Sequence, residues 1–111
     1  MNRTWIELDR EALAHNIRQY RNHLPAGCEL MGVVKANAYG HGAVPFAREL
    51  AKLGVRRFAV AALEEAAELR EGGIEGEILI LGYTHPYGFP QLLEHDICQT
   101  ATCPAHAAQL E

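Results

Sequence analysis

One lysine lies where a charged side chain is uncommon, at the end of an apolar run and just before a glycine-rich turn. The stretch VVKANAYGHG spans residues 33–42, with Val33 and Val34 before Lys35 and with Gly40 and Gly42 after it. An amine shielded by apolar neighbours loses part of the solvation of its charged form and becomes a usable nucleophile. Such an amine can form a Schiff base with a carbonyl group, including the aldehyde of pyridoxal phosphate.

Spacing alone also allows a plainer interpretation of this stretch, which is the more frequent one in proteins. A lysine at a strand end often snorkels, with its ammonium group in water. The glycines most often just make a turn, although closely spaced backbone amides at a helix N-terminus could also meet a phosphate. For His41 we expect a structural contact in the turn rather than a catalytic role.

Three further groups of side chains could carry chemistry. The first has a spacing that matches no standard zinc pattern, so packing and no metal site are expected for Cys98, Cys103, His95 and His106. The second is expected to form the solvated face of a helix and consists of Glu64, Glu65, Glu68, Glu71 and Arg70. The third follows a predicted strand end, where it could border a site or pack within its loop, and consists of Tyr83, His85 and Tyr87.

The composition limits the classes of partner. The chain has 111 residues, 49% of them hydrophobic and 22% charged, and a net charge of -4. This acidic balance argues against nucleic acid or an anionic membrane surface. No apolar run approaches the roughly 20 residues that span a bilayer, and the start lacks the apolar core of a secretory signal. Three cysteines without tight pairing are typical of reduced thiols in the cytoplasm.

Strand and helix patterns alternate along the chain. Apolar runs predict strands over residues 4–8, 29–36, 57–62, 77–83 and 97–102. Amphipathic periodicity and capping residues predict helices over 10–24, 42–54, 63–73, 89–96 and 103–111. Most of the strands are apolar on both faces, which is typical of parallel strands covered by helices. The fold class is therefore α/β.

Two architectures use this repeat of about four βα units. One is part of a closed (β/α)8 barrel, in which we expect neighbouring parallel strands in the order 1-2-3-4. The other is an open doubly wound sheet, whose strand order reverses at a switch point. Both collect ligands at the carboxyl ends of the strands. Met31, Val33 and Lys35 share one strand face by period two, so a barrel would raise Lys35 into its mouth.

Several segments resemble one enzyme family. VVKANAYGHG resembles the pyridoxal phosphate-lysine motif of alanine racemases, which are fold-type III enzymes. TWIELDREALAHNI resembles the opening of the family, and FAVAALEEAAELREGGIEGEILILG resembles its second and third barrel units. The resemblance implies that residues 1–111 are the N-terminal part of a pyridoxal phosphate-binding barrel, with a leading strand and helix in 1–28 and the first βα units in 29–111.

The resemblance also implies roles for three residues. Lys35 would hold pyridoxal 5'-phosphate and act as acid and base on one face of the substrate α-carbon. Tyr39 would place its hydroxyl on the cofactor phosphate, and Leu81 would line the cofactor pocket. The implied reaction interconverts L- and D-alanine for the cell wall, in a cytoplasmic homodimer. The family's tyrosine base for the opposite face, its pyridine-facing arginine and its β-rich second domain match nothing here, so these residues alone are expected to be inactive.

Other functions stay open. ILGYTHP at residues 80–86 resembles the racemase domains of vancomycin-resistance serine racemases, so serine is a second candidate substrate. Another fold-type III protein, such as a decarboxylase or a pyridoxal phosphate-homeostasis protein, would share a lysine at a strand end. A catalytically silent half-barrel that binds partners is the third alternative.

Overall fold

Strands alternate with helices along the chain. A computed structural model describes residues 4–111; residues 1–3 of the predicted leading segment lie outside the described residues. The elements are α1 (Arg10–Asn22), β1 (Met31–Val33), α2 (Lys35–Tyr39), α3 (Ala43–Lys52), β2 (Arg57–Val60), α4 (Leu63–Glu71), β3 (Glu77–Ile80), a 3-10 turn (Pro86–Gly88), α5 (Phe89–Glu94), β4 (Cys98–Gln99) and α6 (Pro104–Leu110). Among residues 4–111, no helix combines the length and apolarity that a membrane crossing requires.

The four strands form one parallel sheet whose spatial order follows the chain. The order is β1-β2-β3-β4, and every neighbouring pair is parallel. The register aligns Val33 with Ala59, Ala59 with Leu79, and Leu79 with Cys98. The predicted order 1-2-3-4 is confirmed, and the order shows no reversal of the kind that a doubly wound sheet requires.

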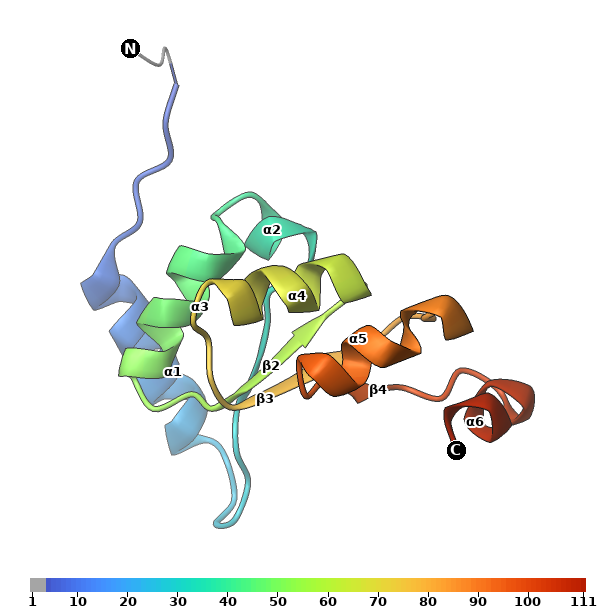
Figure 1. The fold of residues 1–111 in the computed structure, drawn as a ribbon. Helices are drawn as coiled ribbons and strands as arrows, with labels where there is room; N and C mark the ends of the chain where they lie inside the picture. Colours follow the sequence, from blue (N-terminus) through green and yellow to red (C-terminus); the bar gives the residue numbers. More distant parts are fainter. Residues whose placement is uncertain (1–3) are drawn as a thin grey trace.

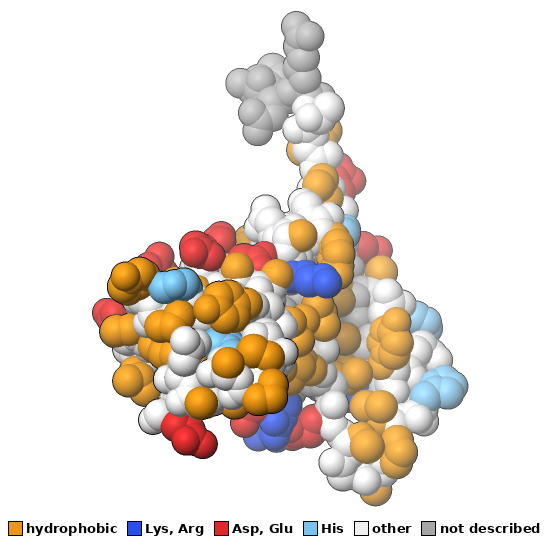
Figure 2. All heavy atoms as spheres, turned by 90° about the vertical axis from the view of Figure 1, so that its right-hand side faces the viewer, with side chains coloured by type: hydrophobic (Ala, Val, Ile, Leu, Met, Phe, Trp, Pro, Cys, Tyr) orange, Lys and Arg blue, Asp and Glu red, His pale blue; other side chains and the backbone are white. Residues whose placement is uncertain are grey.

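The two faces of the sheet have different surroundings. Helices α3, α4 and α5 lie on one side of it (Figure 1). The residues that point to that side are fully buried, and the set consists of Val34, Phe58, Val60, Ile78 and Ile80. On the other face, Met31 and Val33 are 39% and 45% exposed. A space-filling view from the side of β4 and α6 shows apolar side chains spread over this surface (Figure 2). One face of the sheet is therefore a packed core, and the other is partly exposed within the described residues, although Ala59 at its centre is buried.

The predicted strand at residues 4–8 is wrong. Residues 4–9 belong to no helix and no sheet, and Trp5 and Ile6 are 70% and 62% exposed. The β propensity of this segment is real, but a strand needs a neighbouring strand to accept its backbone hydrogen bonds. No strand of the described part of the chain runs beside it. Asp9, by contrast, caps α1 as expected, since its carboxylate accepts the amides of Glu11 and Ala12 at 2.9 and 3.2 Å.

The remaining strands exist but are shorter than predicted. The segment predicted over 97–102 contains only Cys98–Gln99 as β4. Beyond Gln99 the chain bends toward α6, where the Thr102 amide donates to Nδ1 of His106 at 3.2 Å. An apolar sequence pattern marks the run of buried residues, whereas the ladder ends where the backbone finds another partner.

Arg70 holds two loops together, which corrects its expected place on a solvated helix face. Its guanidinium donates to the carbonyl oxygens of Ile74 and Gly76 at 2.9 Å each. It also donates to those of His95 at 2.7 Å and Asp96 at 2.9 Å. One side chain thus joins the end of α4 to the start of β3 and to the turn after α5.

A cluster of charges lies at the amino ends of the strands. Glu29 pairs with Arg56 and Arg57, and Arg57 also pairs with Glu77. Hydrogen bonds from Arg57 and then Arg56 hold the pKa of Glu29 below its ordinary value of 4.5, and Glu29 in turn raises the pKa of Arg57. This exposed cluster ties β1, β2 and β3 together at the end of the sheet opposite Lys35.

Candidate functional site

Lys35 and Leu81 lie at the same rim of the sheet. Backbone pairing continues past the strand ends, because the Val34 amide donates to Ala59 at 2.9 Å and the Leu81 amide donates to Val60 at 2.8 Å. Extending the register places Ala61 between Lys35 and Leu81. Adjacent strands lie 4.7–4.9 Å apart, so the backbones of Lys35 and Leu81 are about 10 Å apart. The two predicted site residues therefore lie at the same carboxyl end of the sheet, two strands apart.

A left-handed turn follows Lys35, and the sequence analysis did not anticipate it. The consecutive residues Ala36, Asn37, Ala38 and Tyr39 all have φ between 53° and 55°. For residues other than glycine this conformation costs roughly 1–2 kcal/mol each. The predicted strand ends before this turn, at Val33. Such a run of strained residues directly after a candidate reactive lysine points to a functional constraint.

Side chains and backbone groups within the turn hold it in place. The Ala43 amide donates to Oδ1 of Asn37 at 2.8 Å, and the Gly42 amide donates to the Asn37 carbonyl at 2.9 Å. Nδ1 of His41 donates to the Ala38 carbonyl at 2.8 Å, and its ring lies 5.8 Å from that of Phe46. His41 therefore has the structural role that we expected for it.

The glycine turn does not offer free amides for a phosphate. The amides of Gly40, His41 and Gly42 all donate to carbonyl oxygens within residues 36–38. Gly40 and Gly42 have φ of 94° and 90°, which explains the choice of glycine at both positions. The motif makes a turn, as in the plainer interpretation, and the amides of residues 40–42 are not free to bind a phosphate.

The Lys35 amine is uncommitted within residues 4–111. The side chain is half-buried and takes part in none of the ion pairs or hydrogen bonds found among these residues. Lys52, the other lysine, instead pairs with Glu49 at 3.1 Å. Tyr39 is 64% exposed and Leu81 is 42% exposed. The three predicted site residues therefore remain available for contacts with a ligand.

Glu65 is a polar residue of the rim that sequence reasoning assigned to a solvated face. It is half-buried, and its Oε2 accepts the Ala36 amide at 2.6 Å. Its Oε1 accepts the amides of Ala61 and Ala62 at 2.8 and 3.1 Å. The available signal was a glutamate at the third position of a predicted helix, where such a side chain reaches back to cap it. The contact with Ala36 had no local signal.

A buried histidine lies near the end of β3 but is fully engaged. His106 is 1% exposed, its Nε2 donates to the Thr84 carbonyl at 3.0 Å, and Nδ1 accepts from Thr102. The Tyr83 ring packs 4.6 Å from it. Packing is thus confirmed for His106, whereas Cys98 and Cys103 are exposed, which contradicts that expectation for the cysteines. No cluster of three metal-ligating side chains occurs between residues 4 and 111.

The other two residues of the third group interact with each other. Nδ1 of His85 accepts the Tyr87 amide at 3.2 Å, and the two rings stack at 4.6 Å. Tyr87 is nevertheless 92% exposed. This contact belongs to the loop that precedes α5, so loop packing is the interpretation that the structure supports.

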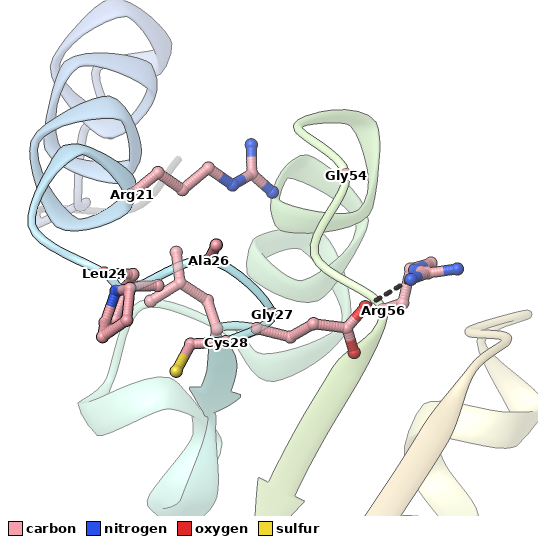
Figure 3. A pocket seen from close by; sticks show the side chains of 10 residues that line it. Arg21, Leu24, Ala26, Gly27, Cys28, Gly54 and Arg56 are labelled. Atoms are coloured by element: carbon pink, nitrogen blue, oxygen red, sulfur yellow. Dashed lines mark hydrogen bonds and ion pairs between the residues drawn. The ribbon is translucent and has the colours of Figure 1, made fainter.

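A separate hollow of about 390 Å³ lies away from the rim, next to the loop that precedes β1. Figure 3 shows Arg21 and Arg56 on opposite sides of it. Arg21 donates to the Leu53 carbonyl at 2.6 Å, and Arg56 pairs with Glu29. Both guanidinium groups are thus already engaged, and the free thiol of Cys28 also lines the hollow.

Parallel strands added in chain order, with helices on one face and an uncommitted lysine at the carboxyl rim, define the start of a barrel-type α/β protein. A sequence profile described as "Alanine racemase, N-terminal domain" matches residues 8–111. The chain belongs to this alanine racemase family. Its βα units are the N-terminal part of a (β/α)8 barrel, as its structural relatives also indicate.

Individual relatives agree with this assignment. The chain is 43% identical over 108 residues to alanine racemase 2 of Oceanobacillus iheyensis, and the aligned region covers 97% of this chain and 28% of that protein. The structure of a Bacillus anthracis alanine racemase with bound L-Ala-P matches with a TM-score of 0.90 and 36% identity, over 99% of this chain and 29% of that one. A histidine racemase of Leuconostoc mesenteroides matches with a TM-score of 0.84 and 31% identity, over 91% and 27%. The chain thus spans less than a third of each of these proteins.

Proposed function

We propose that this chain forms the first part of the barrel domain of a pyridoxal phosphate-dependent alanine racemase. The observation that carries the proposal is the position of Lys35. It lies one residue after the last ladder bond of β1, beside a strained left-handed turn, with no ion-pair partner among residues 4–111. A surface lysine with a purely solubilising role needs neither the rim position nor the turn.

The residues present fit one end of the cofactor. Bound pyridoxal phosphate supplies an aldehyde that a lysine amine can capture and a ring that accepts negative charge. The free Lys35 amine suits the aldehyde, and the exposed Leu81 offers apolar surface on the same rim. The exposed Tyr39 hydroxyl is the group for the phosphate, because the amides of Gly40, His41 and Gly42 are already used.

Lys35 is then the group that removes and returns a proton on one face of the substrate α-carbon. An inversion also needs an acid on the opposite face. Within this chain no residue is assigned to that task. We propose that it comes from the other subunit of a homodimer, as the family resemblance implies, and that residues 1–111 alone do not racemise.

The substrate is the amino acid alanine in this proposal. A second candidate is another small amino acid such as serine. The structural match to a protein named histidine racemase is a reason to keep a second candidate substrate, because a similar half-barrel then occurs in a protein named for a different amino acid. The cytoplasm remains the proposed location, since Cys28, Cys98 and Cys103 are exposed and unpaired, as in a reducing compartment.

The test is to map the cofactor in the complete protein. Borohydride reduction followed by proteolysis and mass spectrometry should find the pyridoxyl group on Lys35, and Lys35→Ala should remove both this label and the visible absorption band. Lys52→Ala is the matched control and should retain both. Chiral chromatography with L-alanine, L-serine and L-histidine then ranks the substrates. A label on Lys52, or racemisation retained in Lys35→Ala, would refute the proposal.

A further inference from the structure

We propose that Glu65 is a positioning residue for Lys35, an inference that rests on the proposed role of Lys35. The Glu65 carboxylate is shared between two parts of the rim. Oε1 accepts the amides of Ala61 and Ala62, where β2 ends and α4 begins. Oε2 accepts the amide of Ala36 at 2.6 Å. One side chain therefore connects the start of α4 to the peptide bond that follows the lysine.

The Ala36 amide is the point where the chain leaves the sheet. Two residues earlier, the amide of Val34 donates to the carbonyl of Ala59 and is the last ladder bond of β1. The following residues adopt the left-handed conformation, and the Ala38 amide donates back to the Val34 carbonyl at 2.9 Å. The peptide between Lys35 and Ala36 thus joins two incompatible backbone geometries, and the carboxylate of Glu65 is the partner of its N–H group.

This contact restricts the backbone of Lys35 from both sides. The sheet holds the chain at Val34, and Glu65 holds it at Ala36. The ψ angle of Lys35 sets the direction of the Ala36 amide, so fixing that amide also fixes the direction in which the lysine side chain leaves the rim. Reaction rates depend steeply on such placement, since a misplacement of 1 Å can cost on the order of 100-fold.

A helix cap alone would not require this arrangement. Capping of α4 uses Oε1, whereas the contact with Ala36 uses Oε2. Glutamine at this position keeps one oxygen but presents an NH2 group where the second acceptor was, so it cannot satisfy both sets of donors. Glutamine therefore breaks one of the two contacts, and an independent N-cap at residue 62 is needed to separate capping from the contact with Ala36.

The experiment measures capture of the cofactor rather than turnover. Pyridoxal phosphate is added to the cofactor-free complete protein, and the appearance of the visible band is followed by stopped flow, with the labelled lysine mapped after borohydride reduction. We expect Glu65→Gln to slow band formation on the order of tenfold. Glu68→Gln, on an exposed residue of the same helix, is the control and should behave like the unaltered protein.

A second variant separates positioning from stability. Ala62→Ser adds a conventional N-cap to α4, so the double variant Glu65→Gln with Ala62→Ser should recover thermal stability while capture stays slow. Recovery of both, or an unchanged rate in Glu65→Gln with the label on Lys35, overturns the inference alone. A label on another lysine in the unaltered protein overturns the proposed function and this inference with it.

Discussion

The left-handed turn after Lys35 predicts that replacing an alanine with glycine raises stability. Ala36 has φ of 53° and an exposed side chain, so Ala36→Gly removes conformational strain without removing buried surface. The amide that donates to Glu65 is kept, since glycine has the same backbone N–H. In a regular helix the same substitution lowers stability, which makes the sign of the effect diagnostic.

The magnitude follows from two opposing terms. The left-handed conformation costs a residue such as alanine roughly 1–2 kcal/mol, and glycine avoids most of it. Glycine gives back about 0.4–1 kcal/mol through the larger conformational freedom of the unfolded chain. The free energy of unfolding should therefore rise by about 0.5–1 kcal/mol in Ala36→Gly. For the control, Ala12→Gly in the exposed first part of α1 should lower it by about 0.5–1 kcal/mol.

The assay is urea unfolding of the cofactor-free complete protein, followed by far-ultraviolet circular dichroism. With slopes of about 1–3 kcal/mol per molar urea, each change shifts the midpoint by roughly 0.2–1 M, in opposite directions for the two variants. Equal slopes are needed for the midpoints to report stability. If Ala36→Gly lowers the midpoint as much as Ala12→Gly does, residue 36 does not have the left-handed conformation in solution.

Three further predictions concern stability, pH and activity. Arg70→Met should lower the free energy of unfolding by about 3 kcal/mol, because it leaves four carbonyl groups without their charged donor. The control Arg48→Met loses one exposed hydrogen bond to Gly72 and should lower it by less than about 1 kcal/mol. Equal losses of the two variants in urea titrations would contradict this prediction. Arg57 and Arg56 lower the pKa of Glu29 in the folded protein. The contribution of ionised Glu29 to stability is therefore complete above pH 4.5 and is lost as the pH falls through the lower folded-state pKa. In a plot of melting temperature against pH, Glu29→Gln should flatten the fall on the acid side. An unchanged acid limb would show that the pair does not form. Residues 1–111 with added pyridoxal phosphate should not racemise alanine or serine in chiral chromatography, and conversion at a rate comparable to that of the complete protein would refute the assignment of the second base to another segment.

The order of the elements was predictable because it depends on local patterns. Apolar runs that alternate with amphipathic segments marked all four βα units, and the glycines at positions 54 and 73 marked helix ends. Gly54 and Gly73 both have the positive φ that favours glycine at such positions. The position of Lys35 at the carboxyl rim followed from its place at the end of an apolar run. The strand at residues 4–8 failed for a physical reason, since a strand pattern does not state whether a partner strand is present.

The rest depended on contacts between distant residues. Glu65 and Arg70 look like ordinary charges on a helix, and only the fold brings them to Ala36 and to the turn after α5. The left-handed turn was also hidden, because alanine and tyrosine are poor residues for that conformation and a pattern of propensities cannot predict strain. The left-handed turn and the contact between Glu65 and Ala36 both depend on tertiary contacts that local sequence preferences do not reveal.

After β1, each strand of this sheet pairs with the strand that immediately precedes it in the chain. Paired residues in β1 and β2, β2 and β3, or β3 and β4 are only about 20 to 26 residues apart, so each pairing closes a loop of modest length. A ribosome adds residues at roughly 5–20 per second, which brings out a new strand every 1–5 s. The sheet can therefore grow at one edge during translation, because β2, β3 and β4 each find the strand they pair with already made.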